Sequence, residues 1–285
     1  MSSEVATDAT TASPSIEDWT TIPWRKLEAY VFRLQKRIFQ AQRRGNVRAV
    51  HSLQRLLMKS RAARTLAVRR VTQDNRGKKT AGVDGVKAVG PLVRLLYVDR
   101  LRHPTTIKAR PVRRVLIPKP GKLNEFRPLG IPILLDRAHQ ALVKLALEPQ
   151  WESRFEAHSY GFRPGRSCHD ALAAIYLGIR QRPKYVLDAD IRGCFDNIAF
   201  QPLLTKLDTY PHLRQTIKAW LNAGMLYDGV LSATTTGVPQ GGTISPLLCN
   251  IALHGMEQVA ATAVPPKRGR PRLIRYADDV RRFTR

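Results

Sequence analysis

Apolar residues recur every three or four positions in the first part of the chain, the spacing that places them on one face of a helix. They are Leu27, Val31, Leu34 and Ile38, followed after an interruption at Gly45-Asn46 by Val47, Val50, Leu53 and Leu57. Because glycine and asparagine favour turns, the pattern predicts a helical hairpin between Trp24 and Val71.

The pattern changes after this hairpin. Residues 69–85 are basic, contain several glycines and lack an apolar period, which predicts a loop close to phosphate groups. A β-favouring run at 112–117 predicts a strand that ends at Pro118, and a second strand is predicted from Phe126 to Ile131. Helical spacing returns between Asp136 and Trp151 and predicts a buried helix.

Two acidic pairs lie on predicted β structure. A strand over residues 185–191 would place Asp188 and Asp190 on one face, and Asp278-Asp279 lies at the tip of a predicted hairpin. Each pair alone has an ordinary explanation, because aspartates at strand ends and turns usually cap or hydrate the backbone. Antiparallel neighbours that bring Asp190 beside Asp278 could instead hold two metal ions about 3.5–4 Å apart.

The charge balance indicates a polyanionic partner. The 285 residues include 48 Lys and Arg against 22 Asp and Glu, a net charge of +26, and the 43% hydrophobic content is enough for a core. Nucleic acid is the expected partner, and an anionic membrane surface or a ribosomal location are the alternatives. No segment approaches the roughly 20 apolar residues needed to span a bilayer, so no membrane partner is expected.

Basic side chains crowd the outer faces of the predicted hairpin and recur further along the chain. A helix that uses charge only for solubility would mix in more Glu and Asp, so contact with an RNA backbone is the favoured interpretation. The candidate RNA-binding residues are Arg37, Arg43, Arg44, Arg61, Arg64, Arg69, Arg70, Lys78, Lys79, Arg163 and Arg166.

The cysteines Cys168, Cys194 and Cys249 have no paired spacing, which indicates neither a disulfide framework nor a zinc site and fits a reducing, cytoplasmic location. Cys168 and Cys194 are expected as small buried side chains with no part in catalysis. His158 and His254 are likewise expected at the surface or in packing. Residues 1–18 contain no basic start followed by an apolar run, so they are expected to form a mobile, disordered leader.

Six ordered segments resemble the reverse transcriptases encoded by group II introns. Tyr276-Ala-Asp-Asp279 is similar to the Tyr-x-Asp-Asp signature of reverse transcriptases, Asp190-Ile-Arg-Gly-Cys-Phe-Asp196 to their first carboxylate motif, and Gly237-Val-Pro-Gln-Gly241 to their Gly-x-Pro-Gln-Gly segment. Arg114–Pro120, Arg127–Pro132 and Ser159–Ser167 resemble blocks of the group II intron subclass. The resemblance runs from the helical hairpin to the last residue.

The resemblance implies roles for individual residues. Asp190 and Asp278 would hold two Mg²⁺ ions, with Asp279 nearby and the backbone carbonyl of Ile191 as a further oxygen ligand. Phe195 would pack under the incoming sugar, with a plain core position as the alternative. The remaining nucleotide-binding positions would be Lys119 and Arg127 at the triphosphate and Gln240 and Gly241 at the nucleotide and template, where a simple turn before a helix starting near Ser245 is the alternative.

The implied fold is α+β: right-hand polymerase fingers and a partial palm of antiparallel sheet backed by helices, preceded by a basic helical N-terminal extension. The extension would cover residues 19–79, and the fingers and palm residues 80–285. After the aspartates, Arg281 and Arg282 stand where the family has apolar residues, and the rest of the palm, the thumb and the maturase domain are absent. We therefore expect a truncated chain with Asp278 on an exposed sheet edge and with weak or no activity alone.

The implied function is RNA-directed DNA synthesis in a mobile group II intron, together with RNA binding that assists splicing and retrohoming. The expected partners are intron RNA, an RNA template with a DNA primer, and deoxynucleoside triphosphates, and a homodimer is left open. A second hypothesis is a non-catalytic, RNA-binding splicing cofactor. A third is an inactive remnant, suggested by the two arginines after the aspartates.

Overall fold

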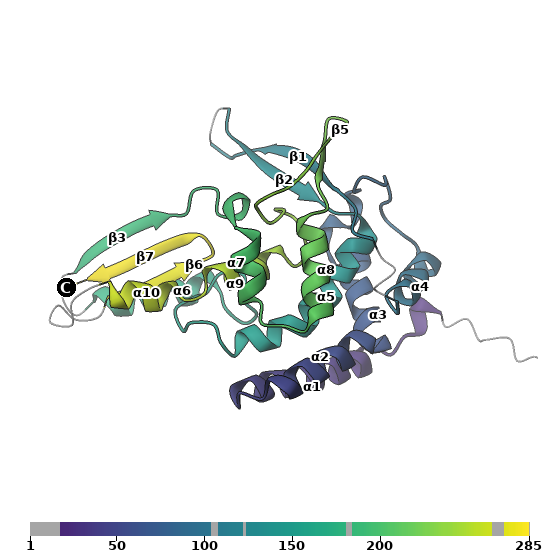
Figure 1. The fold of residues 1–285 in the computed structure, drawn as a ribbon, viewed down its shortest axis with the longest axis horizontal. Helices are drawn as coiled ribbons and strands as arrows, with labels where there is room; N and C mark the ends of the chain where they lie inside the picture. The colour runs from purple at the N-terminus through teal and green to yellow at the C-terminus, as the bar shows by residue number, and fades with distance from the viewer. Residues whose placement is uncertain (1–17, 104–107, 122–123, 181–183, 264–270, 285) are drawn as a thin grey trace, which may run out of the picture.

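The computed structural model describes residues 18–103, 108–121, 124–180, 184–263 and 271–284. Helices and two separate sheets give the α+β class that the sequence predicts (Figure 1). The predicted leader lies outside the described residues except for Asp18. Its side chain accepts a hydrogen bond from the Thr20 backbone N–H and so caps the short helix η1 (Trp19–Thr21).

The N-terminal region has one more break than predicted. Helix α1 (Trp24–Arg43) and helix α2 (Val47–Lys59) are separated at Gly45-Asn46, as expected. Ser60 then starts a third helix, α3 (Arg61–Arg69), because its hydroxyl accepts the backbone N–H of a residue in the first turn. The predicted hairpin is therefore a three-helix unit.

The basic stretch after α3 is more regular than the predicted loop. It continues as a π-helical turn, η2 (Arg70–Asp74), and a 3-10 turn, η3 (Arg76–Lys79). Val71 and Thr72 are buried in the same core as α3, which explains why the chain stays wound there. The prediction of an irregular loop was wrong for these residues.

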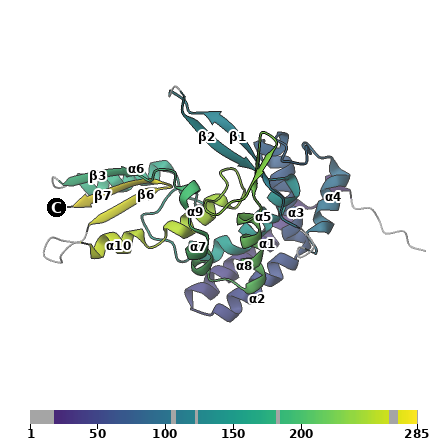
Figure 2. The same cartoon turned by 45° about the horizontal axis from the view of Figure 1, so that its top comes forward.

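Helix α5 (Leu134–Glu152) lies at the centre of the core, where the sequence predicts a buried helix. Helices α1, α2 and α3 all pack against it, and Figure 2 shows it among α1, α3 and α8. Leu142, Leu147 and Trp151 are fully buried. Burying such large apolar side chains is the main source of folding free energy, so α5 is the element around which the protein is built.

Shorter helices complete the fold. They are α4 (Pro91–Arg100), α6 (Cys168–Ile179), η5 (Phe195–Asn197), α7 (Phe200–Lys206), α8 (Pro211–Leu221), α9 (Ser245–Leu253) and α10 (Met256–Thr262). Helix α9 begins at Ser245, as predicted. Among the residues that the structure describes, no helix combines the length and the apolar character needed to cross a membrane.

The first sheet has the strand order β2-β1-β4-β5. Strands β1 (Val112–Pro118) and β2 (Phe126–Ile131) form the antiparallel pair that the sequence predicts. Strands β4 (Met225–Tyr227) and β5 (Val230–Ser232) extend the sheet, with β4 parallel to β1. The β1–β2 pair projects away from the helices (Figure 1).

The second sheet has the order β3-β7-β6 and is antiparallel throughout. Its strands are β3 (Tyr185–Asp190), β6 (Arg272–Tyr276) and β7 (Asp279–Thr284). The expectation that Asp278 lies on an open edge was wrong, because β7 is the central strand and is hydrogen-bonded on both sides. The edge is β3. Arg281 of β7 forms an ion pair with Asp188 of β3, so this arginine is accommodated inside the sheet.

Candidate active site

Three aspartates lie near one another, at the end of β3 and at the β6–β7 turn. Asp190, the last residue of β3, lies opposite Asp279, the first residue of β7. The Ile191 backbone N–H donates to the Asp278 carbonyl oxygen at 3.2 Å, which joins the turn to the end of β3. Ala277 adopts the left-handed conformation, with φ at 58°, and so tightens the turn. The structure thus brings together the three aspartates that the sequence singled out.

The carboxylates disfavour one another electrostatically. Asp190 and Asp279 are exposed, and Asp278 is half-buried. Partial desolvation raises the pKa of the Asp279 carboxyl above its ordinary value, the charges of Asp278 and Asp190 raise it further, and Arg281 opposes the shift. A bound cation would relieve this repulsion.

The donor atoms around this cluster suit Mg²⁺, which prefers oxygen ligands. The Ile191 carbonyl oxygen accepts the Cys194 backbone N–H at 3.2 Å and keeps a second lone pair for an ion. In the described ranges, no three His, Cys, Asp or Glu side chains are gathered closely enough to hold a metal ion. The oxygen donors therefore fit the ion chemically, and the carboxylates would have to draw together around it.

Phe195 lies on η5, close to the acidic cluster in sequence. Its ring meets that of Phe162 edge to face, with 5.9 Å between ring centroids. The Phe195 carbonyl oxygen accepts the Val238 backbone N–H at 2.7 Å. Phe195 is half-buried, so it is held between two neighbouring segments and is not enclosed in the core.

The loop at 237–242 packs against the end of β2 through its backbone. The Gly130 N–H donates to the Gln240 carbonyl oxygen at 2.6 Å. Gly241 has a φ of 118°, and a Cβ at this position would lie 2.8 Å from the Gly130 carbonyl oxygen, so only glycine fits. The Gln240 side-chain amide lies 3.5 Å from Asp196, beside a hollow of about 440 Å³ between this loop and the first sheet.

The two predicted triphosphate ligands lie on the projecting β1–β2 pair. Arg127 is exposed on β2, opposite Ile117 of β1. The Lys119 ammonium group lies 2.8 Å from the Glu125 carboxylate, so it already has an anionic partner. Arg127 is accessible to a ligand, whereas Lys119 would have to exchange Glu125 for phosphate.

The candidate RNA-binding residues divide by exposure. Arg69 and Lys78 are half-buried, and Arg69 pairs with Glu28 and Asp74. The exposed members are Arg37, Arg43, Arg44, Arg61, Arg70, Lys79 and Arg166.

The prediction that Arg64 and Arg163 contact RNA was wrong, because both side chains are buried. Arg64 donates to the Val98 carbonyl oxygen and ties α3 to α4. Arg163 is held by the Glu152 carboxylate and by the Ser159 carbonyl oxygen. Arginines whose N–H groups donate to acceptors inside the protein have a structural role. The residue type alone therefore does not predict which arginines are exposed.

Sequence reasoning missed a buried charged group beneath the acidic cluster. Arg275, on β6, is only 2% exposed. Cys194 is buried, as expected, and its sulfur lies 3.6 Å from that of the buried Cys249. Cys168 is exposed, so the expectation of a buried side chain was wrong there. The one available signal for Arg275 was a charged residue in a strand that is otherwise apolar at Leu273 and Ile274.

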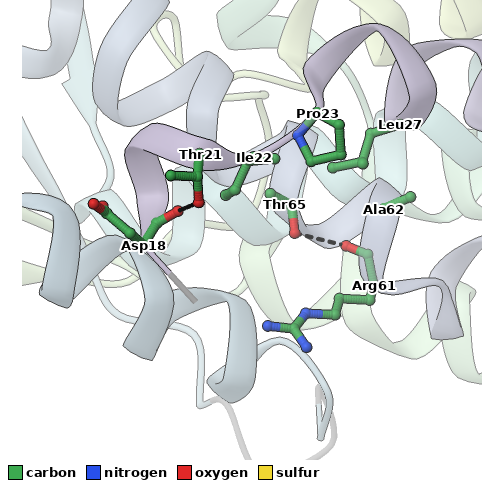
Figure 3. Close-up of a pocket in the computed structure, with 8 residues that line it drawn as sticks. All are labelled: Asp18, Thr21, Ile22, Pro23, Leu27, Arg61, Ala62 and Thr65. Carbon is green, nitrogen blue, oxygen red and sulfur yellow. Dashed lines mark hydrogen bonds between the residues drawn. The ribbon is translucent and has the colours of Figure 1, made fainter. Parts of the chain in front are cut away.

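A separate pocket of about 460 Å³ lies between the start of α1 and α3 (Figure 3). Two hydroxyls at its wall already donate to backbone carbonyls: Thr21 to Asp18 at 3.0 Å and Thr65 to Arg61 at 2.9 Å. The predicted catalytic and nucleotide-binding residues do not line it. We therefore place the candidate site at the acidic cluster.

Comparison with known families gives two matches that together span most of the chain. Residues 19–101 match the N-terminal domain of reverse transcriptase, and residues 117–285 match reverse transcriptase (RNA-dependent DNA polymerase). The second match contains the acidic cluster, the 237–242 loop, strand β2 and the last two residues of β1.

Individual relatives are longer than this chain. Protein YkfC of Escherichia coli strain K12 is 37% identical over 200 residues, covering 66% of this chain and 52% of YkfC. Group II intron-encoded protein LtrA of Lactococcus lactis subsp. cremoris is 40% identical over 159 residues, covering 54% of this chain and 26% of LtrA. Among solved structures, a partial Cas6-RT-Cas1--Cas2 complex has 20% identity and a TM-score of 0.49, covering 81% of this chain and 38% of that one. The chain thus spans about half, or less, of the curated relatives named here.

Proposed function

Because this chain belongs to the reverse transcriptase (RNA-dependent DNA polymerase) family, we propose that its acidic cluster catalyses nucleotidyl transfer. The 3′-hydroxyl of a DNA primer attacks a deoxynucleoside triphosphate opposite an RNA template, and pyrophosphate leaves. The observation that supports this most is the meeting of Asp190, Asp278 and Asp279 at one end of the second sheet. Two Mg²⁺ ions, when bound, would supply activation of the attacking oxygen and neutralisation of the leaving group.

The protein's own residues bind and orient the reactants. Asp190 and Asp278 would hold the ions, and Asp279 would add negative charge beside them. Arg127 binds the triphosphate with its planar guanidinium, and Lys119 joins it after releasing Glu125. Gln240 and Gly241 border the nucleotide and template, and the Phe195 ring packs under the sugar.

RNA is the proposed partner of the exposed basic residues of α1 (Arg37 and Arg43), of the turn after it (Arg44) and of α3 (Arg61). Similarity to a group II intron-encoded protein supports intron RNA as the specific target. Neutralising phosphates with arginine releases counterions, so binding should weaken steeply as salt increases. Helices α1 and α3, which carry exposed candidate arginines, lie well away from the β3-β7-β6 sheet in both views (Figures 1 and 2). This separation also suits a second candidate function, a splicing cofactor that needs only RNA binding.

The test of catalysis is single-nucleotide incorporation on an RNA template with a DNA primer, comparing Asp190→Asn with Asp188→Asn. Asp188 is the matched control because it is exposed on the same strand, two residues earlier, and pairs with Arg281 instead of facing the turn. Loss of a group behind a metal ligand typically costs about 10–100-fold, so loss of the ligand Asp190 should cost more than about 100-fold. Asp188→Asn should change the rate only slightly.

Two outcomes contradict the proposal. One is an Asp190→Asn variant that incorporates nucleotide as fast as the unaltered chain. The other is an Asp188→Asn variant that loses as much incorporation as Asp190→Asn, which would show that the effect does not depend on the proposed metal ligand. An inactive chain that still binds intron RNA and supports splicing would favour the cofactor function.

A further inference from the structure

The side chain of Arg275 lies beneath the acidic turn, and its guanidinium is surrounded by neutral acceptors. One terminal nitrogen, Nη1, donates to the Ala277 carbonyl oxygen at 2.9 Å and to the Asn250 side-chain oxygen at 2.9 Å. The other, Nη2, donates to the Ser159 hydroxyl at 2.7 Å. The residue is 2% exposed. A buried guanidinium without a carboxylate at hydrogen-bond distance is costly, and an apolar residue of similar size would normally be more stable there.

The acceptors come from segments far apart in the sequence. Asn250 is on α9, and its amide also donates to the Gly161 carbonyl oxygen at 2.8 Å. The backbone of Arg275 pairs with the same neighbourhood: its N–H donates to His158 and its carbonyl oxygen accepts from Tyr160, each at 2.9 Å. One side chain therefore ties α9 and the 158–161 segment to the strand that leads into the acidic turn.

These contacts bear directly on where the aspartates lie. The carbonyl fixed by Arg275 belongs to Ala277, the left-handed residue just before Asp278. The next carbonyl along the chain, that of Asp278, accepts the Ile191 N–H beside Asp190. Gly161 closes the turn from below, since a Cβ there would lie 2.2 Å from the Ala277 nitrogen. The path from Arg275 to Asp190 is thus continuous in hydrogen bonds and backbone.

We propose that Arg275 is the positioning residue of the acidic turn: it holds the Ala277 carbonyl so that Asp278 and Asp279 face Asp190. Arg275 acts through the backbone and touches no reactant. The inference rests on the proposed function, because the turn that Arg275 positions is the proposed metal-binding turn. A lysine can make only part of this fork of bonds, and a methionine can fill the space but make none of them.

The experiment compares Arg275→Met, Arg275→Lys and the control Arg272→Met, all on β6. Arg272 is exposed on the same strand, so its loss removes the same charge without touching the network. The first readout is amide hydrogen exchange at Ile191, whose N–H is bonded to the turn. The second is Mn²⁺ affinity, measured by the paramagnetic signal of the free ion. Circular dichroism and exchange in α5 check that each variant is folded.

Removing an outer group that orients metal ligands typically costs about 10–100-fold in affinity. We expect Arg275→Met to weaken Mn²⁺ binding by about this factor and to speed Ile191 exchange by about 10-fold or more, with α5 unchanged. Arg275→Lys should recover part of both effects, and Arg272→Met should show neither. In incorporation assays the loss should fall on kcat more than on KM for the nucleotide.

Unchanged Ile191 exchange in folded Arg275→Met overturns the inference. So does a loss of protection that extends equally through α5, which would make Arg275 a general stability residue. Should Arg275→Met fail to fold, Ser159→Ala removes one acceptor, and it must still speed exchange at Ile191 for the inference to stand. Absence of Mn²⁺ binding in the unaltered chain contradicts the proposed function, and Ile191 exchange then still decides the role of Arg275.

Discussion

The helical core around α5 and the β3-β7-β6 sheet differ in how many apolar side chains they bury. α5 packs against α1, α2, α3, η2 and α9, and large side chains along it are inaccessible to solvent. The sheet has a small core of its own, Tyr160, Ala171, Ile274 and Phe283, to which α6 contributes one residue. Its edge strand β3 exposes apolar side chains on both faces: Val186 is 50% and Leu187 58% exposed.

The difference separates the part that holds the fold from the part that carries the proposed chemistry. Regions with few buried apolar contacts open locally at lower free energy than the global transition. The acidic cluster lies on such a region, and its geometry depends on a small number of hydrogen bonds. Three predictions test this difference, and they involve four variants.

The largest effect is expected from a matched pair of cavity-forming substitutions, Leu142→Ala in α5 and Ile274→Ala in β6. Both side chains are buried. Leu142→Ala should lower the free energy of global unfolding by about 2–5 kcal/mol, because it removes methylene groups and leaves a cavity in the main core. Ile274→Ala should leave the global denaturation midpoint nearly unchanged and instead speed amide exchange in β6 and β7. Urea denaturation measures the free energy of global unfolding, and hydrogen exchange measures the local opening of β6 and β7.

A single global transition lowered equally by both substitutions would contradict this separation. It would mean that the sheet and the helices unfold together. Leu172→Ala is a suitable surface control, since this apolar residue of α6 is 59% exposed and its truncation should change neither readout appreciably.

An intermediate effect is expected at Asp136, a buried carboxyl near the start of α5. Burial raises its pKa from 3.8 to about 6, against a lowering by the Arg110 backbone N–H, which donates to Oδ2 at 3.1 Å. A raised folded pKa means that the folded state binds the proton more tightly, so stability is lost as pH rises from about 4 to about 6 and stays lost above. Asp136→Asn should therefore raise the free energy of unfolding at pH 7 by up to about 3 kcal/mol.

The pH dependence supplies the check on this variant. The advantage of Asp136→Asn over the unaltered chain should shrink towards zero below about pH 4, where the carboxyl is protonated in both states. Chemical denaturation at pH 4, 5, 6 and 7 measures it. An Asp136→Asn variant with a lower free energy of unfolding at pH 7 would show that the ionised carboxylate stabilises the core.

The smallest effect is expected at the ion pair between Arg281 and Asp188 on the sheet. The Asp188 side chain is 65% and the Arg281 side chain 35% exposed, and exposed pairs contribute less than about 1 kcal/mol. Arg281→Met should therefore change the stability of the sheet by less than this amount, measured by exchange in β3 and β7. The change should vanish at 1 M salt, where screening is strong. A larger, salt-independent loss would mean that Arg281 is needed for sheet packing.

Local pattern predicted the elements whose geometry is decided by their own residues. The strands at β1, β2 and β3, the buried helix α5 and the turn before Asp278 follow from alternation, helical spacing and turn residues. Ser60 was missed because a serine inside an apolar repeat gives no sign that its hydroxyl will cap a new helix.

Contacts made across the fold could not be predicted in this way. The burial of Arg64 depends on a carbonyl in α4, and the central place of β7 depends on pairing with a strand some ninety residues earlier in the chain, as the register of Asp190 with Asp279 shows. The aspartates could be named from sequence because their residue types carry the chemistry. Arg275 could not, because its importance comes from the three acceptors that surround it.

The contact between Gly161 and the Ala277 backbone has a consequence for how such sequences can change. A side chain at position 161 would clash with the Ala277 backbone unless the turn moved. Likewise, the turn could not come closer to Gly161 unless the backbone at 161 moved. Substitutions in the two segments are therefore not independent. A related sequence with a larger residue at position 161 should have a displaced acidic turn even if it retains every aspartate. The glycine therefore distinguishes a chain that can form the site from one that only retains the aspartate motif.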